Sequence, residues 1–184
     1  HLAAASAITL VKGDVRSFEF PKEKFSHLIH GAASRSNEED SRLTRETLVD
    51  ATKRVLEFAR QAGVTDCLYV SSGAVYGPQP PHIPHRDEEY AAASDVPPSP
   101  YAEGKRMAEG LCAEYQKRFG LETKIARAFS FVGPHLPIDR HNALGNFMRD
   151  GLSGGPIRVT GDGTPRRSYL YGADLAVWLW TILT

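Results

Sequence analysis

The sequence predicts an α/β fold organised around a parallel sheet. Short apolar runs alternate with longer amphipathic segments, which is the pattern of strands and helices that follow one another in such a fold. The short runs are continuously apolar, as expected for strands that are buried on both faces. With 184 residues, 41% of them hydrophobic, the chain is long enough to bury one substantial core.

The predicted elements begin with four segments that have the length and composition of buried strands: Ala7–Val11, Ser26–His30, Asp66–Ser71 and Thr123–Phe129. A helix is expected over residues 41–62, because Leu48, Val55 and Ala59 recur on one of its faces. Gly63 supplies the stop of that helix.

Proline marks the middle of the chain. Residues 77–100 hold seven of its twelve prolines, which excludes a regular helix or central strand and predicts a long loop. A helix is expected to begin at Pro100, since proline suits the first turn. The expected elements downstream are a helix from Asn142 to near Gly154, a strand at Pro156–Thr160, the turn GDGTPRR and a final helix from Ala173.

The charge balance and the chain ends argue against several partners. The 22 basic and 22 acidic residues cancel, so no basic field is available for nucleic acid. The apolar start lacks the basic segment of a signal peptide, and AVWLWTILT is shorter than the about 20 residues that cross a membrane. Cys67 and Cys112 lie in apolar segments, as buried cysteines in a reducing compartment do. We expect a cytoplasmic protein without membrane or nucleic-acid partners, and a chain incomplete at both ends.

Tyr101 and Lys105 are four residues apart and therefore neighbours on one helical face. The same face carries Ala108, Cys112, Tyr115 and Phe119, so Lys105 stands on an otherwise apolar stripe. Desolvating an ammonium is unfavourable, which favours a lysine whose charge is used. The alternative is that Lys105 extends its head to solvent and Tyr101 is ordinary core, and the helix alone does not decide between the two.

A tyrosine beside a lysine has a specific chemical use. Phenol has a pKa near 10, so it acts as a base near neutral pH only if a cation stabilises the phenolate. Ser71 and Ser72 follow an apolar strand directly, at the carboxyl end where parallel sheets bind ligands. A hydroxyl there can orient a substrate alcohol while the phenolate removes its proton. The alternative for the serines is that they only start a turn.

Other charged groups are interpreted as surface or loop residues. His82, His85, His135 and His141 lie in proline-rich or irregular segments without metal-type spacing, so no metal site is expected. The run from Asp87 to Glu89 is typical of an exposed loop. Arg166 and Arg167 could clamp a diphosphate or simply favour solubility.

In order and spacing, six motifs resemble the extended short-chain dehydrogenases, specifically the NAD-dependent epimerase/dehydratase family that acts on nucleotide sugars. They are GDV at 13–15, HGAA at 30–33, SSGAVYG at 71–77, SPYAEGKRMAE at 99–109, RAFSFVGP at 127–134 and GDGTPRRSYLYGADLA at 161–176. The resemblance implies a Rossmann-like, doubly wound parallel sheet without its first βαβ unit. Residues 1–134 would form an incomplete NAD(P)-binding domain, and residues 135–184 would begin a smaller substrate-binding part.

The resemblance also assigns roles to residues. Tyr101 would be the general base or acid, Lys105 would hold the cofactor ribose and lower the tyrosine pKa, and Ser72 would orient the sugar hydroxyl. Asp14, Ala32, Ala33 and Ser71 would contact the cofactor along with Tyr101 and Lys105. Substrate contacts would come from Ser130, Asn146 and Arg167. The expected cofactor is NAD, with NADP as the alternative, and the expected partners are a nucleotide sugar and a second copy in a homodimer.

Several departures from the family pattern bear on the reaction. The glycine-rich turn that receives the pyrophosphate is absent from these residues. Gly73 and Ala74 stand where family dehydratases and decarboxylases carry carboxylic acids, and Ser130 replaces the usual asparagine. The first hypothesis is therefore a nucleotide-sugar 4-epimerase or ketoreductase with hydride transfer at C4. The alternatives are a 4,6-dehydratase or UDP-glucuronate decarboxylase, and, from another class, a non-catalytic NAD(P)-binding regulatory module.

Overall fold

The centre of the fold is a three-stranded parallel sheet. Its strands are β1 (His27–His30), β2 (Asp66–Ser72) and β3 (Glu122–Ala128), in the spatial order β1-β2-β3. Because the strands are parallel, their carboxyl ends share one edge of the sheet. The computed structural model describes residues 8–33, 41–77, 97–136, 138 and 143–184.

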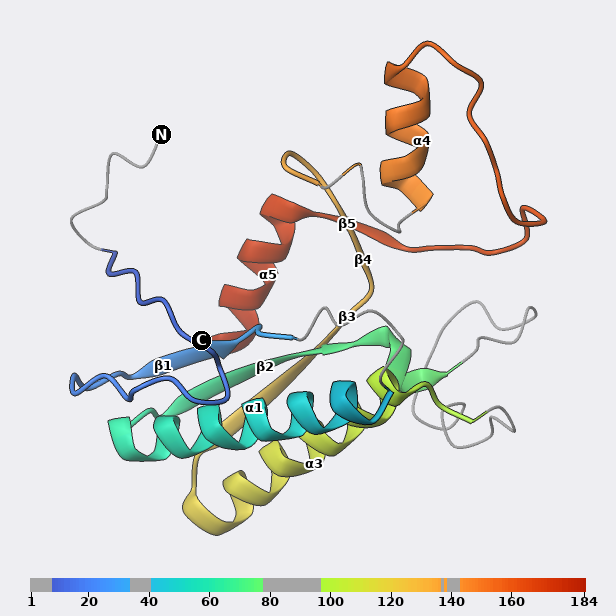
Figure 1. The fold of residues 1–184 in the computed structure, drawn as a ribbon. Helices are drawn as coiled ribbons and strands as arrows, with labels where there is room; N and C mark the ends of the chain where they lie inside the picture. Colours follow the sequence, from blue (N-terminus) through green and yellow to red (C-terminus); the bar gives the residue numbers. More distant parts are fainter. Residues whose placement is uncertain (1–7, 34–40, 78–96, 137, 139–142) are drawn as a thin grey trace.

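Helices cover both faces of this sheet. Helix α1 (Ser41–Ala62) and helix α3 (Pro100–Phe119) lie side by side on one face, and α5 (Gly172–Leu183) lies on the other (Figure 1). The arrangement confirms the predicted α/β fold with a parallel, Rossmann-like sheet. None of the helices within the described ranges is long and apolar enough to cross a membrane.

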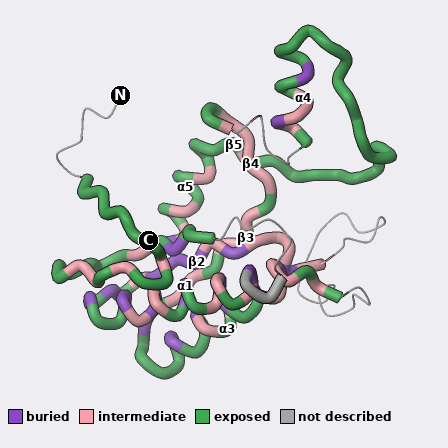
Figure 2. Tube along the Cα trace, viewed as in Figure 1, coloured by how far each residue is buried: buried purple, intermediate pink, exposed green. Residues whose placement is uncertain are grey.

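The buried core lies between the sheet and the pair α1 and α3, where the buried segments of the chain gather (Figure 2). The helices approach closely at Gly104, where an added Cβ would lie 2.9 Å from Cδ1 of Leu48. Cys67 and Cys112 are both fully buried free thiols in this core. Helix α1 ends at the predicted position, since Gly63 follows it with a φ of 77°.

The chain after β3 leaves the core and returns to it. Strand β4 (Ser130–Val132) pairs in parallel with β5 (Tyr169–Tyr171), and between them the chain forms α4 (Ala143–Leu152) and a long exposed excursion (Figure 1). Neither of these short strands was predicted from the sequence.

Two predicted strands are wrong. Residues 8–11 and residues 156–160 form no strand, and both segments are exposed to solvent, with Leu10 91% accessible. An apolar run becomes a strand only where a neighbouring edge accepts its backbone hydrogen bonds. No described strand pairs with either segment.

Candidate active site

Helix α3 starts where the sequence indicated. Ser99 caps it, its Oγ accepting a hydrogen bond of 3.2 Å from the amide of Ala102, and Pro100 occupies the first turn. Gly120 ends it in the left-handed region, with a φ of 71°. These boundaries place Tyr101 in the first turn and Lys105 in the second, against β2.

Lys105 is buried, with 2% of its surface exposed. Its Nζ donates a 2.8 Å hydrogen bond to the carbonyl of Val70 in β2. The same atom lies 4.7 Å from the ring centre of Tyr69 and 5.9 Å from that of Tyr101. Burial lowers the pKa of Lys105 to about 8, against an opposing effect of the Glu109 carboxylate. The alternative in which the lysine head reaches solvent is therefore wrong.

Ser72 is the last residue of β2 and caps the short 3-10 helix η2 (Gly73–Tyr76). Its Oγ accepts a 3.2 Å hydrogen bond from the amide of Ala74. The serine thus does start a turn, as the alternative interpretation expected. A hydroxyl that accepts one hydrogen bond still keeps its own proton for donation, so the turn is compatible with a second role.

A charged network that the sequence interpretation missed joins Ser71, the residue before Ser72, to α3 and β3. Ser71 is buried, and its Oγ donates a 2.5 Å hydrogen bond to Oε1 of Glu109 on α3. Arg127 of β3 donates to both oxygens of the same carboxylate, at 3.1 and 2.8 Å, and to the hydroxyl of Tyr76 at 3.1 Å. The hydrogen bonds to Glu109 raise the pKa of Arg127 further above its ordinary value.

The backbone after Ser72 is closed to larger side chains. A Cβ added at Gly73 would lie 2.5 Å from Cε1 of Phe129. The ring of Phe129 in turn stacks on Tyr76, with ring centres 6.4 Å apart. Position 73 therefore admits glycine alone unless Phe129 moves.

The carboxyl end of β1 contributes small and buried groups to the same edge. Ala32 and Ala33 follow the strand and are exposed. His30 is buried, its Nε2 lies 3.1 Å from Oγ1 of Thr52, and burial together with the charge of Lys105 lowers its pKa to about 4. Asp14 is exposed, and hydrogen bonds and an ion pair with Arg16 lower its pKa to about 2.

The three predicted substrate residues fall in two pockets. Asn146 and Arg167 line one pocket of about 680 Å³, which α4 and the following excursion form together with Arg149 and Arg158. Ser130 lines a different pocket of about 380 Å³, between α5 and strands β3, β4 and β5.

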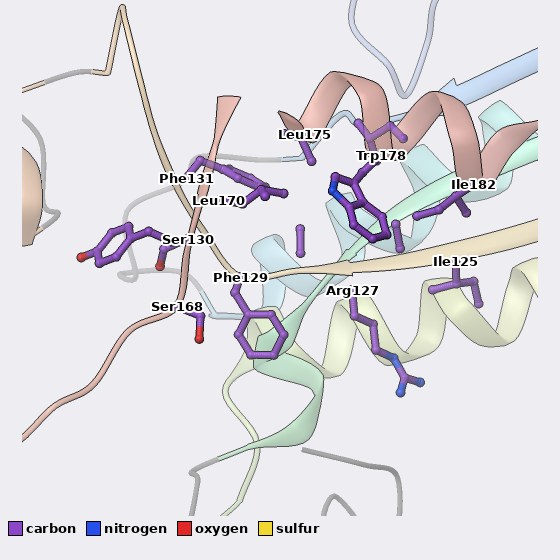
Figure 3. Close-up of a pocket in the computed structure, with 14 residues that line it drawn as sticks. Ile125, Arg127, Phe129, Ser130, Phe131, Ser168, Leu170, Leu175, Trp178 and Ile182 are labelled. Atoms are coloured by element: carbon purple, nitrogen blue, oxygen red, sulfur yellow. The ribbon is translucent and has the colours of Figure 1, made fainter. Parts of the chain in front are cut away.

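The second of these pockets is largely apolar. Trp178 and Ile182 of α5 face it, whereas the side chain of Arg127 points away from α5 and toward α3 (Figure 3). Its walls therefore suit packing against apolar groups, and the charged atoms of the site lie on the other side of the sheet.

No group of three or more potential metal ligands gathers within the part of the chain that the structure describes. His135 is exposed there, while His82, His85 and His141 lie outside the described residues. Residues 78–96, the main part of the predicted loop, also lie outside them, together with the acidic run at 87–89.

Comparisons with known proteins agree on one family. The profile of the "NAD dependent epimerase/dehydratase family" matches residues 2–184. UDP-glucuronic acid decarboxylase 5 of Arabidopsis thaliana is 36% identical over 136 residues, which cover 72% of this chain and 38% of that protein. The chain spans 30–40% of the length of the curated relatives that it matches.

Solved structures match the fold. UDP-N-acetylglucosamine 4-epimerase from Methanobrevibacter ruminantium superposes with a TM-score of 0.83 at 22% identity, over 95% of this chain and 57% of that one. UDP-glucose 4-epimerase from Thermus thermophilus, solved as a complex with NAD, has a TM-score of 0.72 at 28% identity, over 86% and 53% of the two chains.

Proposed function

Because the chain belongs to the NAD-dependent epimerase/dehydratase family, we propose that it carries the active site of a nucleotide-sugar 4-epimerase or related ketoreductase. The observation that supports this proposal most is the buried ammonium of Lys105, held at the carboxyl end of β2 beside the ring of Tyr101. A binding module without catalysis has no need of a desolvated lysine paired with a tyrosine.

The residues of this edge fit a nicotinamide dinucleotide. Among the described residues, the Val70 carbonyl alone accepts a hydrogen bond from Lys105, so two ammonium protons remain for ribose hydroxyls. The exposed Ala32 and Ala33 present small side chains at the end of β1, where a ligand can approach the backbone. When bound, the cofactor would take up and return the hydride of the sugar carbon.

Each side chain then has a defined task. Tyr101 removes the proton of the C4 hydroxyl, and Lys105 stabilises the phenolate on which this depends. Ser72 donates its free hydroxyl proton to the sugar oxygen and so fixes the alcohol against the tyrosine. Asp14 and Ser71 stay proposed cofactor contacts, of which Ser71 already donates to Glu109.

The pocket with Asn146 and Arg167 is the proposed place for the nucleotide diphosphate. Arg149 and Arg158 also line it and form ion pairs with Asp150 in its wall, so a bound diphosphate would share these two cations with that carboxylate. Ser130 remains a proposed substrate contact from the neighbouring pocket. A homodimer through the outer faces of α1 and α3 is part of the same proposal.

The geometry after Ser72 favours epimerisation over dehydration. Elimination of water needs an acid near the leaving hydroxyl, and the family dehydratases place one directly after the serine or threonine. Here that position is Gly73, and Phe129 occupies the space that a side chain would need. Ala74 provides no acid either.

Decarboxylation is the second candidate, because the curated relatives at 31–36% identity are UDP-glucuronic acid decarboxylases. Oxidation of a glucuronate at C4 places a ketone β to the carboxylate, so carbon dioxide leaves with formation of an enolate, and C5 then takes a proton, either from water or the one that Tyr101 removed from the C4 hydroxyl. Ser72, Tyr101 and Lys105 would therefore suffice for this reaction too.

The test uses the full-length protein with a panel of UDP-, dTDP-, GDP- and CDP-sugars, analysed by mass spectrometry. An unchanged mass with a new isomer supports the epimerase, and a loss of carbon dioxide the decarboxylase. A loss of water would contradict the argument from Gly73. Tight NAD binding without turnover of any sugar would instead support the alternative of a non-catalytic NAD(P)-binding regulatory module.

A further inference from the structure

We infer that Glu109, paired with Arg127, is a positioning residue that sets the geometry of Ser72 and Lys105 together. The inference rests on the proposed function, since it concerns how the proposed catalytic groups are held. It starts from the observation that one carboxylate contacts the strand residue before Ser72 and stands one helical turn after Lys105.

The first contact fixes the strand end. Glu109 has 11% of its side chain exposed, and its Oε1 accepts the 2.5 Å hydrogen bond from Ser71. Ser71 and Ser72 are consecutive in β2, so their side chains point to opposite sides of the sheet. Holding Ser71 toward α3 therefore fixes the rotation of the strand end, and with it the position at the carboxyl edge from which Ser72 begins the turn.

The second contact fixes the turn that Ser72 begins. Arg127 joins Glu109 to the hydroxyl of Tyr76, the last residue of η2, and its guanidinium carbon lies 4.9 Å from the centre of that ring. Arg106 adds two hydrogen bonds to the carbonyl of Val75, one of them at 2.8 Å. The last two residues of the turn are thus tied to charged groups, and together with the Ser71 contact these ties flank Ser72 in the chain.

The third effect is electrostatic and reaches Lys105. Among the residues that the structure describes, the groups facing its ammonium are His30 from β1, Tyr69 and the Val70 carbonyl from β2, and Tyr101 and Glu109 from α3 itself. His30 is neutral near pH 7, because burial lowers its pKa to about 4. Glu109 is therefore the negative charge among them that keeps the lysine protonated.

A purely structural role is the competing explanation. Partly buried ion pairs often contribute little to stability, so the pair could serve only to hold α3 against β3. The two explanations differ in what they predict for the pH dependence of the reaction, because a structural tie has no reason to change the protonation of Lys105.

The experiment compares Glu109→Gln with Glu114→Gln in the full-length enzyme, using NAD and the sugar nucleotide that the wild type converts. Glu114 is the matched control, since it forms an exposed ion pair with Arg118 on the same helix. We expect Glu109→Gln to lower kcat about tenfold or more by misplacing the reacting groups, and to move the alkaline limb of kcat/KM toward neutral pH. Glu114→Gln should change neither quantity.

Arg127→Lys separates geometry from charge and serves if Glu109→Gln does not fold. Lysine keeps the positive charge but cannot bond Glu109 and Tyr76 together, so kcat should fall while the alkaline limb stays in place. A folded Glu109→Gln enzyme with the wild-type kcat and pH profile would overturn the inference and leave the proposed function standing. If the wild type converts no sugar nucleotide, it is the proposed function that fails.

Discussion

The ammonium of Lys105 lies 2.8 Å from the carbonyl oxygen of Val70, inside the contact between α3 and β2. This hydrogen bond satisfies one proton of the buried ammonium, and Glu109, one helical turn later, supplies the opposite charge that acts on it. The hydrogen bond also fixes the ammonium near the ring of Tyr101, where the proposed reaction needs a cation. The first expectations concern these two residues.

Tyr101→Phe should abolish turnover and leave NAD binding nearly unchanged. The substitution removes the hydroxyl that exchanges a proton with the substrate but keeps the ring and the helix around it. Product formation and NAD binding, the latter followed by fluorescence titration, would be measured on the same preparation. Tyr90→Phe offers a control at another tyrosine of the chain. Turnover at the wild-type rate in Tyr101→Phe would remove the tyrosine from the mechanism.

The stability of the protein should depend on pH through Lys105. Its pKa is about 8 in the folded protein and near 10.5 when unfolded, so the unfolded state binds more protons between these values. Relative to a Lys105→Met variant, the wild type should therefore gain stability as the pH rises from 8 to 10.5. The gain should be of the order of 3 kcal/mol, from about 1.4 kcal/mol for each pH unit.

Urea unfolding of the wild type and Lys105→Met at several pH values measures this difference. Comparing the two proteins cancels the titration of the tyrosines and cysteines that they share. A difference in free energy of unfolding that stays constant from pH 8 to 10.5 would show that Lys105 titrates normally in the fold.

Gly73→Ala should destabilise the protein by about 1–3 kcal/mol, because the new methyl group overlaps the ring of Phe129. Gly110→Ala on α3 is the matched control. Nothing lies within 4 Å of a Cβ added there, so alanine should stabilise the helix by about 0.5–1 kcal/mol. Thermal unfolding of both variants tests whether the two substitutions change the stability in opposite directions. Combining Gly73→Ala with Phe129→Leu should recover part of the loss, and a Gly73→Ala protein as stable as the wild type would contradict the overlap.

Much of the fold was predictable where apolar periodicity was long. The helix at 41–62 has its predicted end and the helix from Pro100 its predicted start, because Gly63 and Pro100 mark these limits in the sequence. The strand β2 was expected at nearly its observed length. Strands β4 and β5 were not predicted, because a strand of three residues is too short to show the alternation of apolar and polar side chains. The predicted strands failed at residues 8–11 and 156–160 for another reason: composition does not reveal whether a neighbouring edge exists.

The site was predictable in part for similar reasons. Lys105 stood out because it interrupts an apolar stripe, and it is indeed buried. Glu109 and Arg127 did not stand out, since a charged residue is usually exposed and these two are 18 positions apart. Only the packing of α3 against β3 brings them together. The position of Glu109 four residues after Lys105 was the one signal in the sequence that could have drawn attention to it.

His30 should make the protein sensitive to acid. Its pKa is about 4 in the fold and near 6.5 when unfolded, since burial beside the charged Lys105 disfavours the imidazolium. The contribution of the neutral ring is fully present above pH 6.5 and is lost as the pH falls toward 4, because the unfolded state then binds the additional proton. The loss should be about 3 kcal/mol.

His30→Asn should remove this acid sensitivity, because asparagine is polar and does not titrate. The matched control is His27→Asn on the same strand, where the histidine side chain is 38% exposed. Free energies of unfolding measured in urea from pH 7 to 4 should converge for the wild type and His30→Asn as the pH falls, since the wild type alone loses the contribution of a buried neutral histidine. The His27→Asn comparison shows whether the convergence is specific to the buried position 30. A constant difference between the wild type and His30→Asn across that range would mean that His30 binds its proton equally well in the folded and unfolded chain, and that the Lys105 charge does not act on it.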